Sequence, residues 1–291
     1  MFRLRLTFVW IPALAFFWVL ATAFAHEPPA DKKAEKPPTI APPTEQEVAR
    51  KRMRFMKTAL ARYTVHVSKQ KEAATVLDPC LRWSNPISGV PDGILAVYAL
   101  NGGRPAAIAQ FFQNGPSSWV NEFTIIPESD VTIQRSDALF WKPSEYVCKF
   151  TELPRSPAPA VTPALRLTQM RDIAADFSAI DYFGYKETKE DLRLLRQPVY
   201  RYSEKVNILD GAVFVFALGT NPECCVLLEA CRNNNGSSYR YAVAPMSIYQ
   251  LEVCHKGRLV WEIGRREPAG ANSRSYYAGG YTPEPGESLP K

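Results

Sequence analysis

The sequence lacks the motifs that identify several classes of enzyme. No glycine-rich phosphate loop follows a strand-like run and opens a helix, and no Gly-x-Ser-x-Gly motif marks a serine hydrolase. Cys224 and Cys225 are adjacent, which is not the spacing of a Cys-x-x-Cys redox motif. The chain therefore has no recognisable set of residues for nucleotide binding, serine hydrolysis or thiol exchange.

Metal ligands and excess charge are also scarce. The chain has 3 histidines among 291 residues, without the clustered spacing of a zinc site, so we expect no metal and no cofactor. Lys and Arg number 35 against 29 Asp and Glu, a formal net charge of +6. That balance is too mild to indicate a polyanion, and we expect no nucleic acid partner.

The first residues have the pattern of an export signal. Arg3 and Arg5 precede an apolar run from Leu6 to Leu20, and Ala23-Phe24-Ala25 is a small-x-small cleavage site. Residues 1–25 are predicted to be a signal peptide. The apolar run of about 20 residues could instead stay uncleaved as an anchor. Both readings predict export to the periplasm or the extracellular space, and the proline-rich residues 26–43 predict a disordered tether.

One stretch of the chain occurs twice. The run from Asp92 to Leu100 (DGILAVYAL) matches the run from Asp210 to Leu218 (DGAVFVFAL), 118 residues later (210 − 92 = 118). Upstream matches continue in the same order at a spacing of 119, pairing Pro79, Arg82, Trp83 and Ser84 with Pro198, Arg201, Tyr202 and Ser203. We therefore predict an internal duplication, with unrelated β regions of similar composition as the alternative.

Each half reads as a helix followed by short strands. Thr44 and Glu47 predict a capping box, Thr162-Pro163 predicts a second helix start, and apolar spacing extends the helices to Val67 and Ile180. Short β-like runs with tight turns follow each helix, and the last of the first half is Tyr146 to Phe150. The predicted class is α+β, as two tandem repeats, each an N-terminal helix and an antiparallel meander, packed about a pseudo-twofold axis.

The composition sets the predicted boundaries. Residues 44–153 are the first repeat, 154–161 a proline-rich linker, 162–267 the second repeat and 268–291 a disordered tail. The first helix carries a basic face, which predicts either a solvated surface or weak contact with an anionic membrane surface. Six cysteines in an exported chain could form disulfides or remain buried free thiols.

The chain resembles an uncharacterised family of exported bacterial proteins of planctomycete type. The resemblance is carried by Arg82-Trp83-Ser84-Asn85-Pro86, by Met170-Arg171, and by Leu209-Asp210-Gly211 continuing to Gly219-Thr220. It covers most of residues 44–262. It implies export, but no activity or catalytic residue carries over to this chain, because none is assigned in that family.

The duplicated polar residues are the candidate binding residues: Arg82, Asp92, Arg201 and Asp210. Two carboxylates that meet across a twofold axis can share a proton. Asp-Gly is also ordinary turn chemistry, and an arginine on a strand is often a cross-strand ion-pair partner. Trp83, Trp119, Trp141 and Tyr98 could line a sugar or lipid groove, or belong to the core.

We therefore favour a non-catalytic, exported binding or interaction protein of the cell envelope. Its unknown partner, an envelope component or a small ligand, would bind at the seam between the repeats. The alternative is a hydrolase that uses Asp92 or Asp210 in that cleft.

Overall fold

Two helices begin at the caps that the sequence predicts. In the computed structural model, α1 (Glu45–Leu60) starts after Thr44, whose hydroxyl accepts the Glu47 backbone N–H while the Glu47 side chain reaches back to Thr44. Helix α2 (Pro163–Ala175) starts after Thr162 with proline in its first turn. The structure describes residues 43–68, 70–100, 103–126, 130–184, 186–204, 207–234, 236–266 and 276–290, so residues 1–25 and all of the predicted tether except Pro43 lie outside it.

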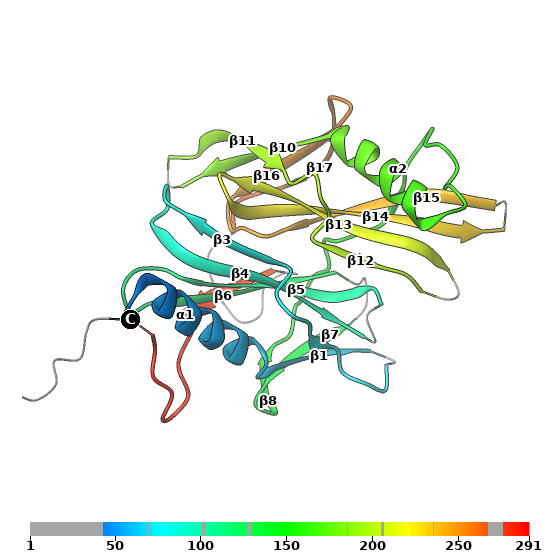
Figure 1. Cartoon of the computed structure of the whole chain (residues 1–291). Coiled ribbons are helices and arrows are strands. Elements are labelled where there is room, and N and C mark those ends of the chain that lie inside the picture. Colours follow the sequence, from blue (N-terminus) through cyan, green and yellow to red (C-terminus); the bar gives the residue numbers. More distant parts are fainter. Residues whose placement is uncertain are drawn as a thin grey trace, which may run out of the picture. The chain divides into compact units, whose positions relative to one another are not determined.

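Strands make up most of the regular structure (Figure 1). The first half contains β1 (Tyr63–Val67), β2 (Thr75–Val76), β3 (Leu81–Asn85), β4 (Val90–Ala99), β5 (Pro105–Gln113), β6 (Trp119–Ile125), β7 (Val131–Arg135), β8 (Ala138–Trp141) and β9 (Thr151–Glu152). The second contains β10 (Phe177–Phe183), β11 (Thr188–Leu194), β12 (Tyr200–Tyr202), β13 (Ile208–Leu218), β14 (Asn221–Asn233), β15 (Gly236–Pro245), β16 (Gln250–His255), β17 (Arg258–Ile263) and β18 (Tyr276–Gly280). The fold is thus mixed, with two helices and antiparallel sheets in the described residues, and is richer in β-structure than predicted.

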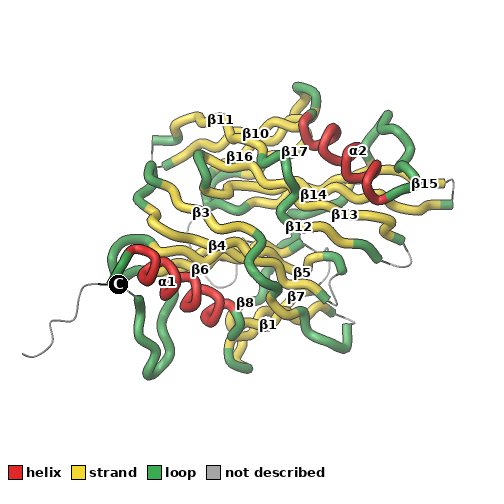
Figure 2. The backbone as a smooth tube through the Cα atoms, in the orientation of Figure 1, coloured by secondary structure: helices red, strands yellow, loops and turns green. Residues whose placement is uncertain are grey.

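The strands form three antiparallel sheets in the described residues (Figure 2). The first has the order β1-β7-β8, and the second has the order β18-β6-β5-β4-β2, with β3 also paired to β4. The third has the order β17-β16-β10-β11-β13-β14-β15-β9, with β12 also paired to β13. A bridge between Val65 and Ala74 links β1 to the residue before β2.

The central strands are buried on both faces. Along β4, Ile94, Ala96 and Tyr98 pack in the core beneath α1, whereas Leu95, Val97 and Ala99 face a second core. That second core also contains β13, β14 and β15 residues, so it lies between the sheets of the two halves. The other face of β13 and β14 packs in a third core beneath α2. Burial on both faces explains why these strands read as nearly continuous apolar runs.

The helices are shorter than the apolar spacing predicts. Helix α1 ends at Leu60 and α2 at Ala175, and the residues that follow are β1 and β10. Tyr63 and Val67 fit a helical repeat, but Tyr63 and Val65 are buried whereas Thr64 and His66 are not, which is the two-residue period of a strand. Thr64, Val65 and Val67 are β-branched, which also favours a strand.

Two further predictions about strands are wrong. Tyr146 to Phe150 pairs with no strand among the described residues. Side-chain contacts fix the segment: the Tyr146 hydroxyl accepts the Val131 N–H, and the Phe150 ring lies beneath the guanidinium groups of Arg104 and Arg240. The predicted disordered tail, 268–291, contains β18, which pairs with the edge of β6. The glycine and tyrosine content of this segment predicted disorder, but β18 shows the alternating burial of a strand, with Tyr276 and Ala278 both buried.

Candidate functional site

The first candidate pair, Arg82 and Asp92, forms a two-pronged ion pair between neighbouring strands. Arg82 donates from Nε to Asp92 Oδ1 at 2.8 Å and from Nη2 to Asp92 Oδ2 at 2.6 Å. Its Nη2 also donates to the Ala49 carbonyl of α1 at 3.3 Å. The pair therefore ties β3, β4 and α1 together within the first half.

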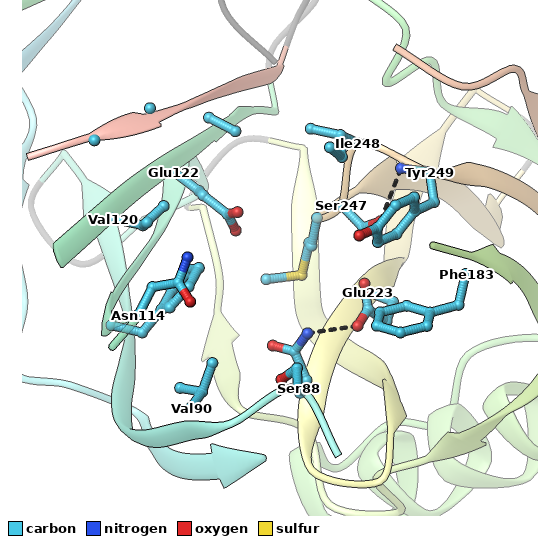
Figure 3. A pocket seen from close by; sticks show the side chains of 16 residues that line it. Ser88, Val90, Asn114, Val120, Glu122, Phe183, Glu223, Ser247, Ile248 and Tyr249 are labelled. Carbon is cyan, nitrogen blue, oxygen red and sulfur yellow. Dashed lines mark hydrogen bonds between the residues drawn. The ribbon is translucent and has the colours of Figure 1, made fainter. Parts of the chain in front are cut away.

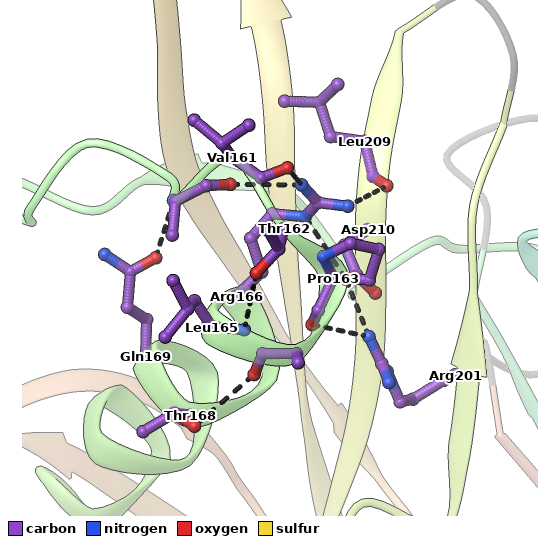
Figure 4. Close-up of polar contacts among 12 residues, drawn as sticks. Val161, Thr162, Pro163, Leu165, Arg166, Thr168, Gln169, Arg201, Leu209 and Asp210 are labelled. Carbon is purple, nitrogen blue, oxygen red and sulfur yellow. Dashed lines mark hydrogen bonds and ion pairs between the residues drawn. The ribbon is translucent and has the colours of Figure 1, made fainter.

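The second candidate pair makes the corresponding contacts (Figure 4). Arg201 donates from Nη2 to Asp210 Oδ2 at 2.7 Å and to the Pro163 carbonyl of α2 at 3.2 Å. Arg166, on α2, adds a third contact by donating from Nε to the same Asp210 oxygen at 3.2 Å. The structure thus pairs Asp92 and Asp210 with arginines of their own halves.

The glycine that follows each aspartate has a packing role. A Cβ atom at Gly93 would lie 2.7 Å from the Trp83 ring, and one at Gly211 would lie 2.4 Å from the Tyr202 ring. Each ring comes from the strand paired with that glycine. In each repeated Asp-Gly pair, the aspartate therefore forms an ion pair with an arginine, and the glycine leaves room for an aromatic ring.

The four candidate residues differ in their access to solvent-filled space. Arg82 and Asp92 line a pocket of about 420 Å³ that also contains Arg193 and Thr220 of the second half. Asp210 is buried beneath α2, with Arg166 and Arg201 as partners. Each aspartate already accepts from an arginine and each pair ties a helix to a sheet, whereas binding by these four residues stays a prediction.

A different carboxylate joins the two halves. Glu229 is fully buried and accepts hydrogen bonds from Arg104 Nε at 2.7 Å, from Arg240 Nε at 2.7 Å and from the Tyr202 hydroxyl at 2.8 Å. Arg104 belongs to the first half and the other three residues to the second. A buried carboxylate with this many donors is satisfied, so Glu229 stabilises the seam.

A larger pocket opens at the same seam. It measures about 510 Å³ and is lined by both halves and by β18. Figure 3 shows Glu122 and Glu223 on opposite sides of the pocket, with their carboxyl groups turned toward its interior. Its other polar side chains include Asn114, Asn221 and Ser247, and its aromatic side chains are Phe112, Phe183 and Tyr249.

Glu122 projects from β6 and is held by neighbours at its base. Gln110, on β5, donates to Glu122 Oε2 at 2.9 Å and also to the Met246 carbonyl at 2.9 Å, across the seam. Burial raises the pKa of Glu122 to about 8, although the hydrogen bond from Gln110 and the charge of Arg266 act in the opposite direction. Glu122 is therefore protonated more readily than an ordinary glutamate.

Glu223 lies beside another buried acid, Asp181. Burial, and then the neighbouring Asp181 and Glu122 carboxyls, raise the pKa of Glu223 well above its usual value, despite hydrogen bonds from Ser247 and Asn221. Burial also raises the pKa of Asp181 to about 7. No N–H or hydroxyl group of the described residues donates to either Asp181 oxygen, and because like charges repel, the neighbouring Asp181 and Glu223 carboxyls favour protonation of one of them.

Sequence reasoning did not find these three acids. Glu122 and Asp181 lie inside apolar strand runs, and Glu223 stands before Cys224-Cys225 in β14. A charged residue within a buried strand was the available signal, because such residues are almost never fully buried unless they have partners. Their spacing of 59 and 42 residues (181 − 122 and 223 − 181) contains no motif that would join them.

The remaining candidate chemistry is not assembled in the described residues. All six cysteines are free thiols there, and Cys148, Cys224, Cys225 and Cys231 are buried. No group of three or more His, Cys, Asp or Glu side chains within the described ranges could hold a metal ion. The four aromatic candidates are all buried: Trp83, Trp119, Trp141 and Tyr98.

Neither helix in the described part of the chain is long and apolar enough to span a bilayer. Comparison with protein-family models, curated proteins and solved structures finds no match.

Proposed function

We propose that this is an exported binding protein of the cell envelope that holds a small ligand in the seam pocket. The observation that carries the proposal is the pocket of about 510 Å³, whose wall is shared by both halves and β18. Ligand sites are typically concave, of about this size, and lined by apolar side chains with a few polar groups. Glu122 and Glu223 are the polar groups that would orient the ligand.

We also propose that the chain is a duplicated α+β module. The order β8-β7-β1, followed by β2-β4-β5-β6, has a counterpart in β17-β16-β10, followed by β11-β13-β14-β15. Strand β3 pairs with β4 as β12 pairs with β13, and the arginine–aspartate pairs occupy corresponding positions. Independent β regions would have no reason to share pairing order and these contacts.

The edge strands support a pseudo-twofold arrangement. Strand β9 follows the first half and pairs with β15 of the second. Strand β18 follows the second half and pairs with β6 of the first. Each half therefore covers the outer edge of the other, which is the reciprocity that a twofold axis produces.

Export rests on the leader pattern of residues 1–25 and the tether that follows. Arg50, Lys51 and Arg54 are exposed on α1, which supports weak contact with an anionic membrane surface. An envelope component is the other class of partner. On this proposal the pocket lies outside the cytoplasm.

A hydrolase is the second candidate function. It would use Glu122 in place of Asp92 or Asp210, because Glu122 faces the pocket and its raised pKa favours the protonated form that a general acid needs. This candidate predicts turnover of a chromogenic ester or glycoside that is lost in Glu122→Gln. Absence of turnover with both substrate types would remove it.

The binding proposal is tested by obstructing the mouth of the pocket. Ser88 is exposed and lines the pocket, so Ser88→Trp should obstruct it without entering the core. Ser68→Trp, at an exposed serine outside the pocket lining, is the matched control. The probes are benzyl alcohol, benzoate and benzyltrimethylammonium, which are neutral, anionic and cationic.

We expect at least one probe to raise the melting temperature of the wild type and of Ser68→Trp, and to have less effect on Ser88→Trp. Stabilisation that is equal in all three proteins, or absent in all three, would overturn the proposal.

A further inference from the structure

We infer that the seam pocket binds a small organic cation, in which an ammonium group is attached to an apolar body. This inference rests on the proposed function, because it names the ligand class of the same pocket. It is drawn from the charges, the unpartnered acid and the aromatic side chains around the pocket.

Acidic groups outnumber basic groups at this site. Glu122 and Glu223 line the pocket, and Asp181 adjoins Glu223, with Glu190 of β11 close enough to raise the pKa of Asp181 by its charge. The basic groups nearby are Arg266 and Arg265. Arg266 donates to the Ser247 carbonyl and lies 5.0 Å from the Tyr276 ring, whereas Arg265 lies 5.5 Å from the Tyr249 ring.

Arg265 also donates to the Gly184 carbonyl at 2.7 Å, which directs part of its guanidinium to the backbone. Two cations thus stand against four carboxyl groups. The other titratable neighbours are the Tyr276 hydroxyl and the Cys224 thiol, which are neutral near pH 7 because burial raises the pKa of both. A bound cation would favour ionisation of the pocket carboxyls, whose raised pKa values otherwise favour their neutral forms.

The buried acid beside the pocket lacks a donor. Asp181 is fully buried, and no described N–H or hydroxyl group donates to its oxygens. Buried carboxylates are normally paired, because an isolated charge in a protein interior is costly. Here burial and the neighbouring carboxyls favour the protonated forms of Asp181 and Glu223, and a cation drawn to Glu223 would favour ionisation instead.

The aromatic side chains that line the pocket support the apolar part of the proposed ligand. Phe183 and Tyr249 meet edge to face with ring centroids 5.0 Å apart, and Phe112 lines the first half of the pocket. Aromatic faces attract ammonium groups through their quadrupoles, and they also cover apolar surface. The guanidinium of Arg265 already lies over one face of the Tyr249 ring, which shows that this ring contacts a cation.

Binding should be coupled to proton release. Before the cation enters, Glu122, Asp181 and Glu223 favour their protonated forms, since burial raises the pKa of each acid. The cation favours the ionised carboxyl, whose proton passes to the buffer. Affinity should therefore increase by up to about tenfold per pH unit, for each proton released, below a pKa of about 8 at Glu122.

The experiment is calorimetry with benzyltrimethylammonium and benzyl alcohol, at pH values between about 6 and 9, in buffers of differing ionisation enthalpy. The trimethylammonium group does not titrate, so any pH dependence belongs to the protein. We expect the cation to bind at least about tenfold more tightly than the alcohol above pH 8, with release of about one proton.

Variants separate charge from shape. Glu122→Gln and Glu223→Gln should each reduce cation affinity about tenfold or more, and lower proton release, while benzyl alcohol binding stays within about twofold. Glu145→Gln removes an exposed carboxylate outside the pocket lining and should change nothing. If either glutamine variant unfolds, the buffer-dependent proton release of the wild type still tests the inference.

The outcomes distinguish this inference from the proposed function. Equal or tighter binding of benzyl alcohol or benzoate, blocked by Ser88→Trp, would overturn the cation while leaving the pocket as a binding site. Cation binding without proton release, or unaffected by both glutamine variants, would also overturn it. Failure of all three probes would overturn both proposals.

Discussion

Gly211 lies directly against the ring of Tyr202, so that a Cβ atom at position 211 would come within 2.4 Å of it. Gly211→Ala and its counterpart Gly93→Ala should each lower the free energy of unfolding by about 1–3 kcal/mol, because the ring has to move in a packed core. Urea unfolding measures this.

Gly264→Ala is the matched control for both glycine variants. No atom lies within 4 Å of a Cβ placed there, so its effect should stay within about 0.5 kcal/mol. Alanine at 93 and 211 with the same small effect as at 264 would show that the rings are not held against the backbone.

Asp210→Asn should destabilise the protein more than Asp92→Asn. The change at 210 leaves Arg166 without its ionised partner, and that side chain is 9% exposed, whereas the Arg82 side chain is 44% exposed and can turn to water. Losing one partner of a buried pair costs about 3–5 kcal/mol, so we expect a cost near that range at 210 and a smaller cost at 92.

Asp78→Asn serves as the surface control, since Asp78 pairs with Lys57 while 87% of its side chain is exposed. Its loss should cost less than about 1 kcal/mol in the same denaturation assay. Both core variants should retain probe binding in the seam pocket. Loss of binding in a folded Asp92→Asn protein would instead return Arg82 and Asp92 to the site.

Stability should fall as the pH rises from about 4.5 toward 8. The pKa of Glu122 rises from 4.5 to about 8 on folding, so the folded state keeps a proton that the unfolded chain has lost. The stabilisation is full below the lower value and is lost as pH passes the higher one. Asp181 and Glu223 act in the same direction, because their pKa values are also raised.

Chemical denaturation at about pH 5, 7 and 9 measures this loss, which we expect to be a few kcal/mol on the scale of about 1.4 kcal/mol per pKa unit. Glu122→Gln should flatten part of the profile, and Glu145→Gln should leave it unchanged. If the stability of the wild type instead rose with pH across this interval, the raised pKa values of the three acids would be contradicted.

The C-terminal segment should be required for stability. Tyr281 packs with its ring centroid 4.9 Å from that of Phe111 and lies 4.4 Å from the Arg135 guanidinium carbon. Tyr281→Ala should cost about 3–5 kcal/mol, as truncation of a buried aromatic residue does. Deleting residues 276–290 should, in addition, expose the edge of β6 and promote aggregation, as light scattering would detect.

Ser288→Ala, at an exposed position of the same segment, should have little effect. If the deletion left the unfolding transition unchanged, residues 276–290 would behave as the tail that their composition predicts.

Local chemistry explains which parts of the fold could be predicted. The helix starts at Thr44 and Thr162 depend on side chains within three residues of the cap, and the predicted runs around Ile94 and Val213 became long buried strands. The helix ends were overestimated because Tyr63 and Val67 suit two periodicities. Strand β18 was missed because its stability comes from β6, about 150 residues earlier in the chain.

The sequence by itself determined the caps, the central strands and the repeated arginine, aspartate and glycine positions, because each depends on neighbours in the chain or on a simple period. Only the tertiary structure decided what those polar residues do, by placing an arginine beside each aspartate. It alone brought Glu122, Asp181 and Glu223 together, from β6, β10 and β14. Their pKa values and the pocket arise from shared burial at the seam, which no local pattern encodes.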